Sequence, residues 1–250
     1  MILTINRPEA RNAVNRDVSL ALGRALAEAE NDESVWVIVL TGAGDKAFSA
    51  GADLKARAQG AQAVDPQSAE ANWGFGGYVR HSISKPTIAA VNGFALGGGL
   101  ELVLASDLAV AADTATFGLP EVRRGIYAAA GGAIRLPRQI PQKIGMEMLL
   151  TGQPISARRA AELGLVNLVV EASDVLDAAL RLAETICEAA PLSVRASKRI
   201  ALGIVDGVIA DEEDDWARNA AEGVVLRQSE DSQEGPRAFV EKREPVWRAR

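Results

Sequence analysis

Short, continuous runs of apolar residues alternate along the chain with segments in which apolar positions recur every three to four residues. The runs predict strands buried on both faces of a sheet, whereas the recurring positions predict amphipathic helices. The predicted strands are residues 2–6, 35–40, 87–91, 108–112 and 166–170. The predicted helices are residues 16–30, 97–105, 142–150, 156–163 and 175–187. Such alternation is typical of an α/β fold with a parallel sheet.

The C-terminal part of the chain has a different pattern. From Pro191 onward the spacing is helical throughout, so we expect residues 1–190 to form a core domain and residues 191–250 a helical region. The acidic run at residues 211–215 is expected near a helix N-terminus, where the helix dipole favours it. Residues 56–76 lack a clear period, which predicts a mobile segment. Cys187 falls on the apolar face of its predicted helix and is expected to be a core thiol.

Composition limits the classes of function. The chain has 250 residues, of which 48% are hydrophobic and 24% charged, as in an ordinary globular protein. Its net charge of -6 disfavours a general nucleic-acid binder, which needs a basic surface. The single cysteine excludes an internal disulfide, the N-terminal residues lack the apolar run of a signal peptide, and no apolar stretch is long enough for a membrane helix. These features favour a cytoplasmic protein.

Two kinds of site are disfavoured by the residues themselves. His81 is the single histidine, so a zinc site built on several histidines is excluded, and no G-x-S-x-G turn accompanies it. Residues 41–47 match the dinucleotide-binding pattern G-x-G-x-x-A after a predicted strand. A dinucleotide site needs a helix that opens on those glycines, and the residues that follow are poor helix formers. A nicotinamide-dependent dehydrogenase is therefore a weak alternative.

Three segments carry candidate chemistry. Residues 46–55 are a loop of small residues, which lets backbone approach a ligand closely. In residues 91–101 a strand passes through a glycine-rich turn into a helix, whose free N–H groups would stabilise an oxyanion. Glu101 lies in the first turn of that helix, where the dipole is expected to favour the ionised carboxylate. A second acid, Glu121, follows Pro120. Either glutamate alone fits a structural role, and the order of the three segments is what favours catalysis.

This order of segments resembles the crotonase (enoyl-CoA hydratase/isomerase) family over nearly the whole chain. The resemblance rests on residues 6–13 (NRPEARNA), 48–55 (FSAGADLK), 92–101 (NGFALGGGLE) and 163–166 (LGLV). It implies a superhelix of repeated β-β-α units, with a C-terminal helical region that builds trimers, often paired into hexamers. One departure is residues 128–132 (AAAGG), where hydratases of the family often carry a Pro-Gly-x-Gly-Gly turn beside the acyl pocket.

The resemblance also implies residue roles. Backbone N–H groups of Ala52 and Gly98 would hold the thioester oxygen, as an oxyanion hole. Glu101 would take a proton from water, and Glu121 would supply one to the substrate. The residues expected to bind coenzyme A are Ala50, Asp53, Leu54, Lys55, Phe239 and Lys242. In the family, the positions of the last two can reach the coenzyme A of a neighbouring subunit.

Because both glutamates are present, the resemblance favours an enoyl-CoA hydratase, which adds water across the 2,3 double bond of a 2-enoyl-CoA thioester in acyl-CoA or fatty acid metabolism. The alternatives are double-bond isomerisation, dehydration of a specialised hydroxyacyl-CoA such as carnitinyl-CoA, and a non-catalytic acyl-CoA-binding protein. No metal or separate cofactor is expected, since coenzyme A is part of the substrate. The expected partners are the acyl-CoA substrate and further copies of the chain in a trimer or a dimer of trimers, with no nucleic acid and no membrane.

Overall fold

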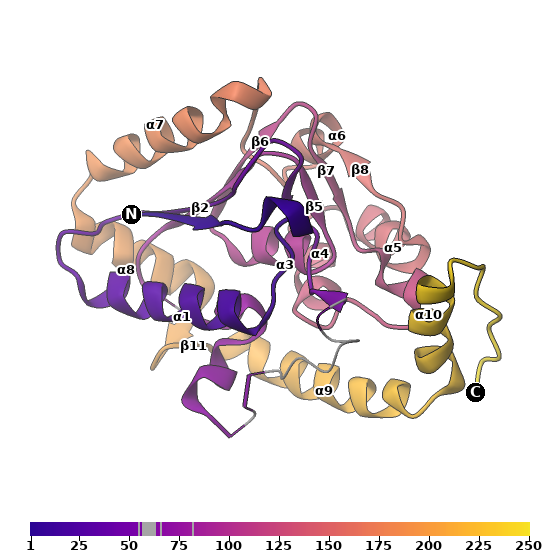
Figure 1. Cartoon of the computed structure of the whole chain (residues 1–250). Coiled ribbons are helices and arrows are strands. Elements are labelled where there is room, and N and C mark those ends of the chain that lie inside the picture. The colour runs from indigo at the N-terminus through magenta and orange to yellow at the C-terminus, as the bar shows by residue number, and fades with distance from the viewer. Residues whose placement is uncertain (55, 57–63, 66, 82) are drawn as a thin grey trace.

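The computed structural model describes residues 1–54, 56, 64, 65, 67–81 and 83–250 (Figure 1). Lys55 lies outside this set, as do residues 57–63 and 66 of the segment that was predicted to be mobile. Strands occupy the centre of the molecule in Figure 1, and helices surround them. Within the described residues, no helix is both long and apolar enough to cross a lipid bilayer.

The larger sheet has five parallel strands in the order β1-β2-β4-β6-β9. These strands are β1 Ile2–Ile5, β2 Ile38–Gly42, β4 Thr87–Val91, β6 Leu108–Ala112 and β9 Leu168–Val170. All five predicted strands are thereby confirmed, although two begin late. In β2 the start moves because Val35 N–H closes a turn on Asp32 O, so the ladder opens only at Ile38, whose N–H donates to Pro86 O. Every residue of β2 and β4 is buried, as expected for strands covered on both faces.

A second sheet was not predicted. It has the order β3-β5-β7-β8, and its strands are β3 Ala47–Ser49, β5 Phe94–Leu96, β7 Thr116–Gly118 and β8 Ile155–Ser156. Each is two or three residues long and lies next to turns, so it gives too little alternation to be recognised. Along the chain, β2 is followed by β3, β4 by β5 and β6 by β7. In each pair the first strand belongs to the larger sheet and the second to the smaller one. This alternation confirms the expected β-β-α winding.

The helices of the core that the structure describes follow the sequence with one exception, α4. They are α1 Arg16–Asn31, α3 Gly98–Ala105, α4 Gly132–Gln139, α5 Gln142–Thr151, α6 Ala157–Glu162 and α7 Val175–Cys187. Helix α4 was missed because it begins in the small-residue run and contains Pro137. Helix α7 packs on β2, β4 and β6, and its buried positions end at Ala183. Cys187 is therefore exposed at the end of the helix, and its prediction as a core thiol is wrong.

The C-terminal segment is not helical throughout. Helix α8 Pro191–Leu202 is followed by a hairpin of β10 Ile204–Val205 and β11 Val208–Ile209, then by α9 Glu213–Arg227 and α10 Glu230–Glu241. Gly203 ends α8 with a φ of 62°. Asp206 and Gly207, with φ of 50° and 79°, form the two-residue turn of the hairpin. The Asp-Gly pair was the available signal for this hairpin.

Part of the acidic run docks helix α9 on the core. Glu212 is buried and accepts from Arg135 of α4, with Arg135 Nε at 2.8 Å and Nη2 at 2.7 Å. Burial alone would raise the pKa of Glu212, but the hydrogen bonds and charge of Arg135 outweigh it and hold this pKa below its ordinary value. Asp215 is also buried and pairs with Arg138 and Arg218. The run therefore makes specific ion pairs in addition to lying at the start of a helix.

Helix α10 packs on a short 3₁₀ helix, η4 (Pro120–Arg124), which carries Glu121. The approach is so close that a Cβ on Gly235 of α10 would lie 1.9 Å from Arg124 O. Only glycine permits this contact between two backbones. In Figure 1 helices α9 and α10 run along the lower and right sides of the molecule, so the C-terminal segment returns to the core far from its own start.

Candidate active site

The N-terminus of α3 and the helix η4 face α9 and α10 across a cavity of about 640 Å³. The cavity brings together segments that are distant in the sequence. Its lining residues are Ala50, Ala52, Leu54, Phe75, Leu96, Gly97, Gly98, Glu101, Pro120, Glu121, Arg124, Ile126, Tyr127, Ala129, Ala130, Gly223, Leu226, Arg227, Ser232 and Phe239.

Two backbone segments meet at one edge of this cavity. A Cβ on Gly51 would lie 2.7 Å from Gly98 N, so the loop that contains Ala52 touches the start of α3. Gly98 is the first residue of α3, and its N–H therefore has no acceptor within the helix. The Ala52 N–H also has no hydrogen-bond acceptor in the part of the chain that the structure describes. The two N–H groups expected to hold an oxyanion are thus both unengaged and line the same cavity.

Glu101 lies in the first turn of α3 and is 3% exposed. The Gly132 N–H donates to its Oε1 at 2.9 Å. Burial, together with the charge of Glu121, raises the pKa of Glu101 to about 8. The helix N-terminus favours the ionised form of this carboxylate, but the loss of water around the buried group and the charge of Glu121 outweigh the dipole.

Glu121 enters the cavity from η4, directly after Pro120. A Cβ on Gly97 would lie 3.0 Å from Glu121 Oε1, which places this carboxyl group beside the start of α3. Its Oε2 is buried without a hydrogen-bond partner among the described residues. Burial raises the pKa of Glu121 to about 7. Since the two carboxyl groups interact and both resist ionisation, the pair holds about one proton near neutral pH.

The remaining predicted residues divide into two groups. Ala50, Leu54 and Phe239 line the cavity, and Phe239 does so in its own chain. Asp53 and Lys242 are not among the lining residues. The Asp53 carboxylate accepts from Arg7 Nη1 at 2.8 Å, and Lys242 is exposed at the C-terminal end of α10. Lys55 lies outside the described residues.

Comparison with known proteins identifies the fold. The whole chain, residues 1–250, matches the family described as enoyl-CoA hydratase/isomerase. The chain belongs to this crotonase family. A carnitinyl-CoA dehydratase of Salmonella enteritidis is 40% identical over 257 residues, which are 99% of this chain and 94% of that protein.

Solved crotonase structures agree with this assignment. A carnitinyl-CoA dehydratase from Mycobacterium avium is 60% identical, with a TM-score of 0.95 over 100% of this chain and 95% of that chain. An enoyl-CoA hydratase from Mycobacterium tuberculosis is 44% identical, with a TM-score of 0.75 over 100% and 95% of the two chains. The protein is therefore a crotonase-family hydro-lyase that acts on an acyl-CoA thioester.

Several polar residues that line this cavity were not predicted from the sequence. Arg124 lies three residues after Glu121, and a short helix started by Pro120 was the signal that could have found it. Tyr127 donates its hydroxyl hydrogen to Asn219 O of α9. Arg227, more than a hundred residues from Glu121, had no local signal. Each of these side chains lines the cavity.

The aromatic residues before β4 have separate roles. Phe75 lines the cavity, and a Cβ on Gly98 would lie 2.4 Å from its ring. Trp73 instead stacks on His81, with ring centroids 4.9 Å apart. Tyr78 is buried, and its hydroxyl group lies 2.9 Å from Ser106 Oγ. Of these three aromatic side chains, Phe75 alone lines the cavity, whereas Trp73 packs on His81.

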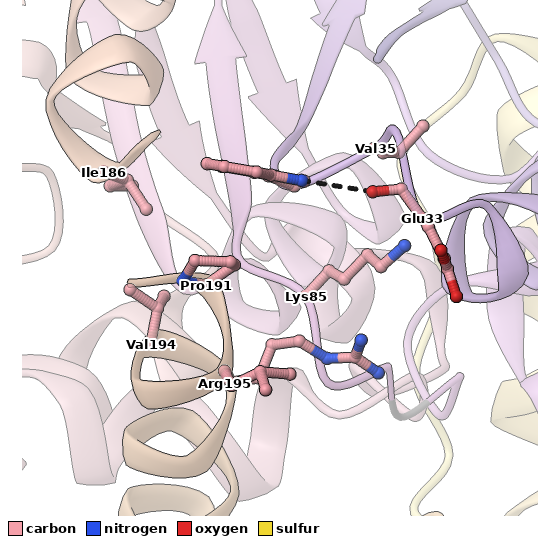
Figure 2. Close-up of a pocket in the computed structure, with 9 residues that line it drawn as sticks. Glu33, Val35, Lys85, Ile186, Pro191, Val194 and Arg195 are labelled. Carbon is pink, nitrogen blue, oxygen red and sulfur yellow. Dashed lines mark hydrogen bonds between the residues drawn. The ribbon is translucent and has the colours of Figure 1, made fainter. Parts of the chain in front are cut away.

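A second pocket, of about 250 Å³, lies between the segment that precedes β2 and the start of helix α8 (Figure 2), and neither Glu101 nor Glu121 lines it. Its two cationic side chains have structural partners. Lys85 donates through Nζ to Asp32 O at 2.6 Å, which satisfies a carbonyl at the end of α1. Arg195 donates to Glu30 Oε1 at 3.0 Å. Since these cations are already engaged, the pocket offers no chemistry that competes with the cavity around the glutamates.

Proposed function

We propose that the protein adds water across the 2,3 double bond of a 2-enoyl-CoA thioester. The thioester oxygen lies between the N–H groups of Ala52 and Gly98. The oxygen of water bonds to C3 while Glu101 takes its proton, and Glu121 gives a proton to C2. The negative charge that develops on the thioester oxygen is stabilised by the two donors, each worth about 3 kcal/mol in other oxyanion holes.

The observation that carries the proposal is the meeting of two buried carboxyl groups with two unengaged N–H groups in one cavity. Addition of water needs one group that accepts a proton and one that donates a proton, and a pair that shares a single proton provides both. The reacting form has Glu101 ionised and the proton on Glu121, which is the less populated arrangement of the pair because the pKa of Glu101 is the higher of the two. The unpartnered Oε2 of Glu121 supports a direct contact with substrate or water. Within the proposal, Ala50, Asp53, Leu54, Lys55, Phe239 and Lys242 keep their coenzyme A binding roles.

Dehydration of a 3-hydroxyacyl-CoA is the second candidate function. The relatives from Salmonella enteritidis and Mycobacterium avium bear the name carnitinyl-CoA dehydratase. Dehydration uses the same carboxyl groups in the reverse order, so the acyl group alone distinguishes the two candidates.

Loss of the enoyl-thioester absorbance of crotonyl-CoA, with product analysis, tests the proposal. We expect 3-hydroxybutyryl-CoA as the product. A shifted double bond would instead show an isomerase, and turnover restricted to carnitinyl-CoA would favour the second candidate. Tight coenzyme A binding with no turnover of any enoyl thioester would indicate a binding protein.

The pH dependence of kcat/KM is expected to be bell-shaped. Below about 7, both Glu121 and Glu101 hold protons, and the base is lost. Above about 8, both are ionised, and the acid is lost. Activity should therefore be highest between the two values, which belong to the coupled pair. Initial rates at low substrate concentration across this range measure the profile, and a rate that stays constant through both values would contradict the shared proton.

Assembly into a trimer or a dimer of trimers is also part of the proposal. Large apolar side chains of the C-terminal segment that are more than half exposed in the single chain support it: Leu192, Ile200, Val205, Val225, Val240 and Val246. Light scattering of the purified protein would give the number of chains.

A further inference from the structure

The direction of the Ala52 N–H is set by a hydrogen-bonded pairing with Val14. The Val14 N–H donates to Gly51 O at 2.8 Å, and the Asp53 N–H donates to Val14 O at 3.0 Å. Val14 and Ala52 thereby form a parallel bridge, in which Val14 bonds to the residues on both sides of Ala52. Because successive N–H groups of an extended chain point to opposite sides, the Ala52 N–H is directed away from Val14. The pairing therefore leaves this donor for the cavity, which Ala52 lines.

One side of this pairing is braced by Asn12, whose side chain is completely buried. Asn12 Nδ2 donates to Ala43 O at 2.9 Å and to Ala47 O at 2.6 Å, which joins the segment to the turn between β2 and β3. On the loop side, Ser49 Oγ donates to Asn12 O at 2.9 Å and accepts from the Gly51 N–H at 3.1 Å. Both chains of the pairing are therefore held by the residues that precede it.

Arg7 connects the two paired chains directly. Its Nη1 donates to Ala13 O at 2.7 Å and to Asp53 Oδ2 at 2.8 Å. Ala13 lies directly before Val14, and Asp53 lies directly after Ala52, so a single guanidinium group bonds to both chains beside the bridge. Arg7 is half-buried and does not line the cavity. It therefore contacts the loop of the oxyanion donor from outside the cavity.

We propose that Arg7 is a positioning residue for the oxyanion hole: its guanidinium bonds keep the Ala52 N–H directed at the thioester oxygen. This inference rests on the proposed function, in which that N–H is one of two donors. An oxyanion donor contributes only where it points at the position of the developing charge. Without Arg7 the backbone bonds of Val14 remain, so the donor is misdirected and not lost.

Replacement of Arg7 by methionine tests the proposal, because methionine keeps the apolar stem of the side chain and removes the donors. We expect Arg7→Met to lower kcat for crotonyl-CoA hydration about tenfold, a part of the roughly 10²–10³-fold that removal of a whole donor costs. Arg7→Lys keeps the charge but lacks the planar fork, and it should recover only part of the loss. Arg16→Met is the matched control, because Arg16 is exposed at the start of α1 and does not line the cavity.

The carbonyl band of a bound thioester gives a readout that a loss of stability does not move. Hydrogen bonds to the thioester oxygen shift this band to lower frequency, and difference infrared spectroscopy measures the shift for butyryl-CoA labelled with carbon-13 at the carbonyl. We expect a smaller shift in Arg7→Met than in the parent protein, and an unchanged shift in Arg16→Met. Because butyryl-CoA is saturated, the measurement needs no turnover. Failure of the hydratase proposal is seen separately, as absence of crotonyl-CoA turnover in the parent.

Two results would overturn the proposal. One is a kcat of Arg7→Met equal to that of the parent. The other is an undiminished carbonyl shift in Arg7→Met, which would assign a lower rate to another cause, such as weaker coenzyme A binding through Asp53. Calorimetry with free coenzyme A would measure that effect. If urea unfolding shows that Arg7→Met does not fold, Arg7→Lys takes its place, and parent values of both kcat and carbonyl shift in that variant would overturn the proposal.

Discussion

Glu101→Gln and Glu121→Gln are each expected to lower kcat for hydration by about 10²–10⁴-fold, the range that a positioned acid or base contributes. Glutamine keeps the shape of the side chain but exchanges no proton under the reaction conditions. In Glu101→Gln the amide oxygen can still accept from Gly132 N–H, so the geometry of the cavity should persist. The rates are measured at saturating crotonyl-CoA, beside the dissociation constant of a saturated thioester, which should change little.

Glu147→Gln provides the control for these two variants. Glu147 is exposed on α5 and does not line the cavity, so its replacement should leave kcat unchanged. If either active-site variant kept more than about a tenth of the parent activity, that glutamate would not be the group that transfers a proton. Loss of thioester binding in parallel with kcat would instead indicate damage to the cavity.

The parts of the fold that the sequence predicted are those with strong local signals. Strands β2, β4 and β6 are continuous apolar runs that are almost entirely buried. Helix α1 is capped by Asn15, whose side chain accepts from Val18 N–H at 3.0 Å. The smaller sheet has no comparable signal. Its strands are two or three residues long, and β3, β5 and β7 pair with neighbours that are distant in the chain.

For the candidate site, the sequence predicted the two backbone segments but not the side chains that distant elements contribute to the cavity. The loop at Gly51 and the turn at Gly98 are local, and the family resemblance rests on the residues that form them. That Glu121 lies beside Gly97 depends on the path of β6 and β7, which spacing alone does not give. Likewise, Arg227 and Phe239 reach the cavity only because α9 and α10 return to the core through buried ion pairs and a glycine contact.

The pKa of Glu101 likewise depends on tertiary packing that the sequence alone does not give. From sequence, Glu101 is a residue in the first turn of a helix, and the dipole suggests an ionised carboxylate. Its actual surroundings are set by tertiary packing, which removes water and adds a second carboxyl group from η4. Desolvation of a buried charge is worth more than the favourable end of a short helix, so the pKa moves upward. Catalytic acid–base pairs are therefore difficult to assign from a single sequence without the fold.

Gly51→Ala is expected to lower kcat/KM for hydration by at least about 10²-fold, the loss that follows removal of one oxyanion donor. Gly51 has a φ of 84°, and its added methyl group would lie 2.7 Å from Gly98 N and 2.9 Å from Leu96 O. Both neighbours are backbone atoms that cannot rotate away. The loop that carries Ala52 must therefore shift from α3, which separates the two N–H groups that we propose hold the thioester oxygen. Initial rates with crotonyl-CoA at low concentration measure the effect.

Gly164→Ala separates this effect from backbone strain. Gly164 has a φ of 79°, close to that of Gly51, but an added Cβ would meet nothing within 4 Å. Both variants thus carry the cost of a left-handed alanine, about 1–2 kcal/mol, and only Gly51→Ala disturbs the oxyanion hole. We expect Gly164→Ala to lose stability toward urea and keep its activity. Equal activity losses in the two variants would assign the effect to strain, and full activity in Gly51→Ala would show that the contact with Gly98 is not needed for the reaction.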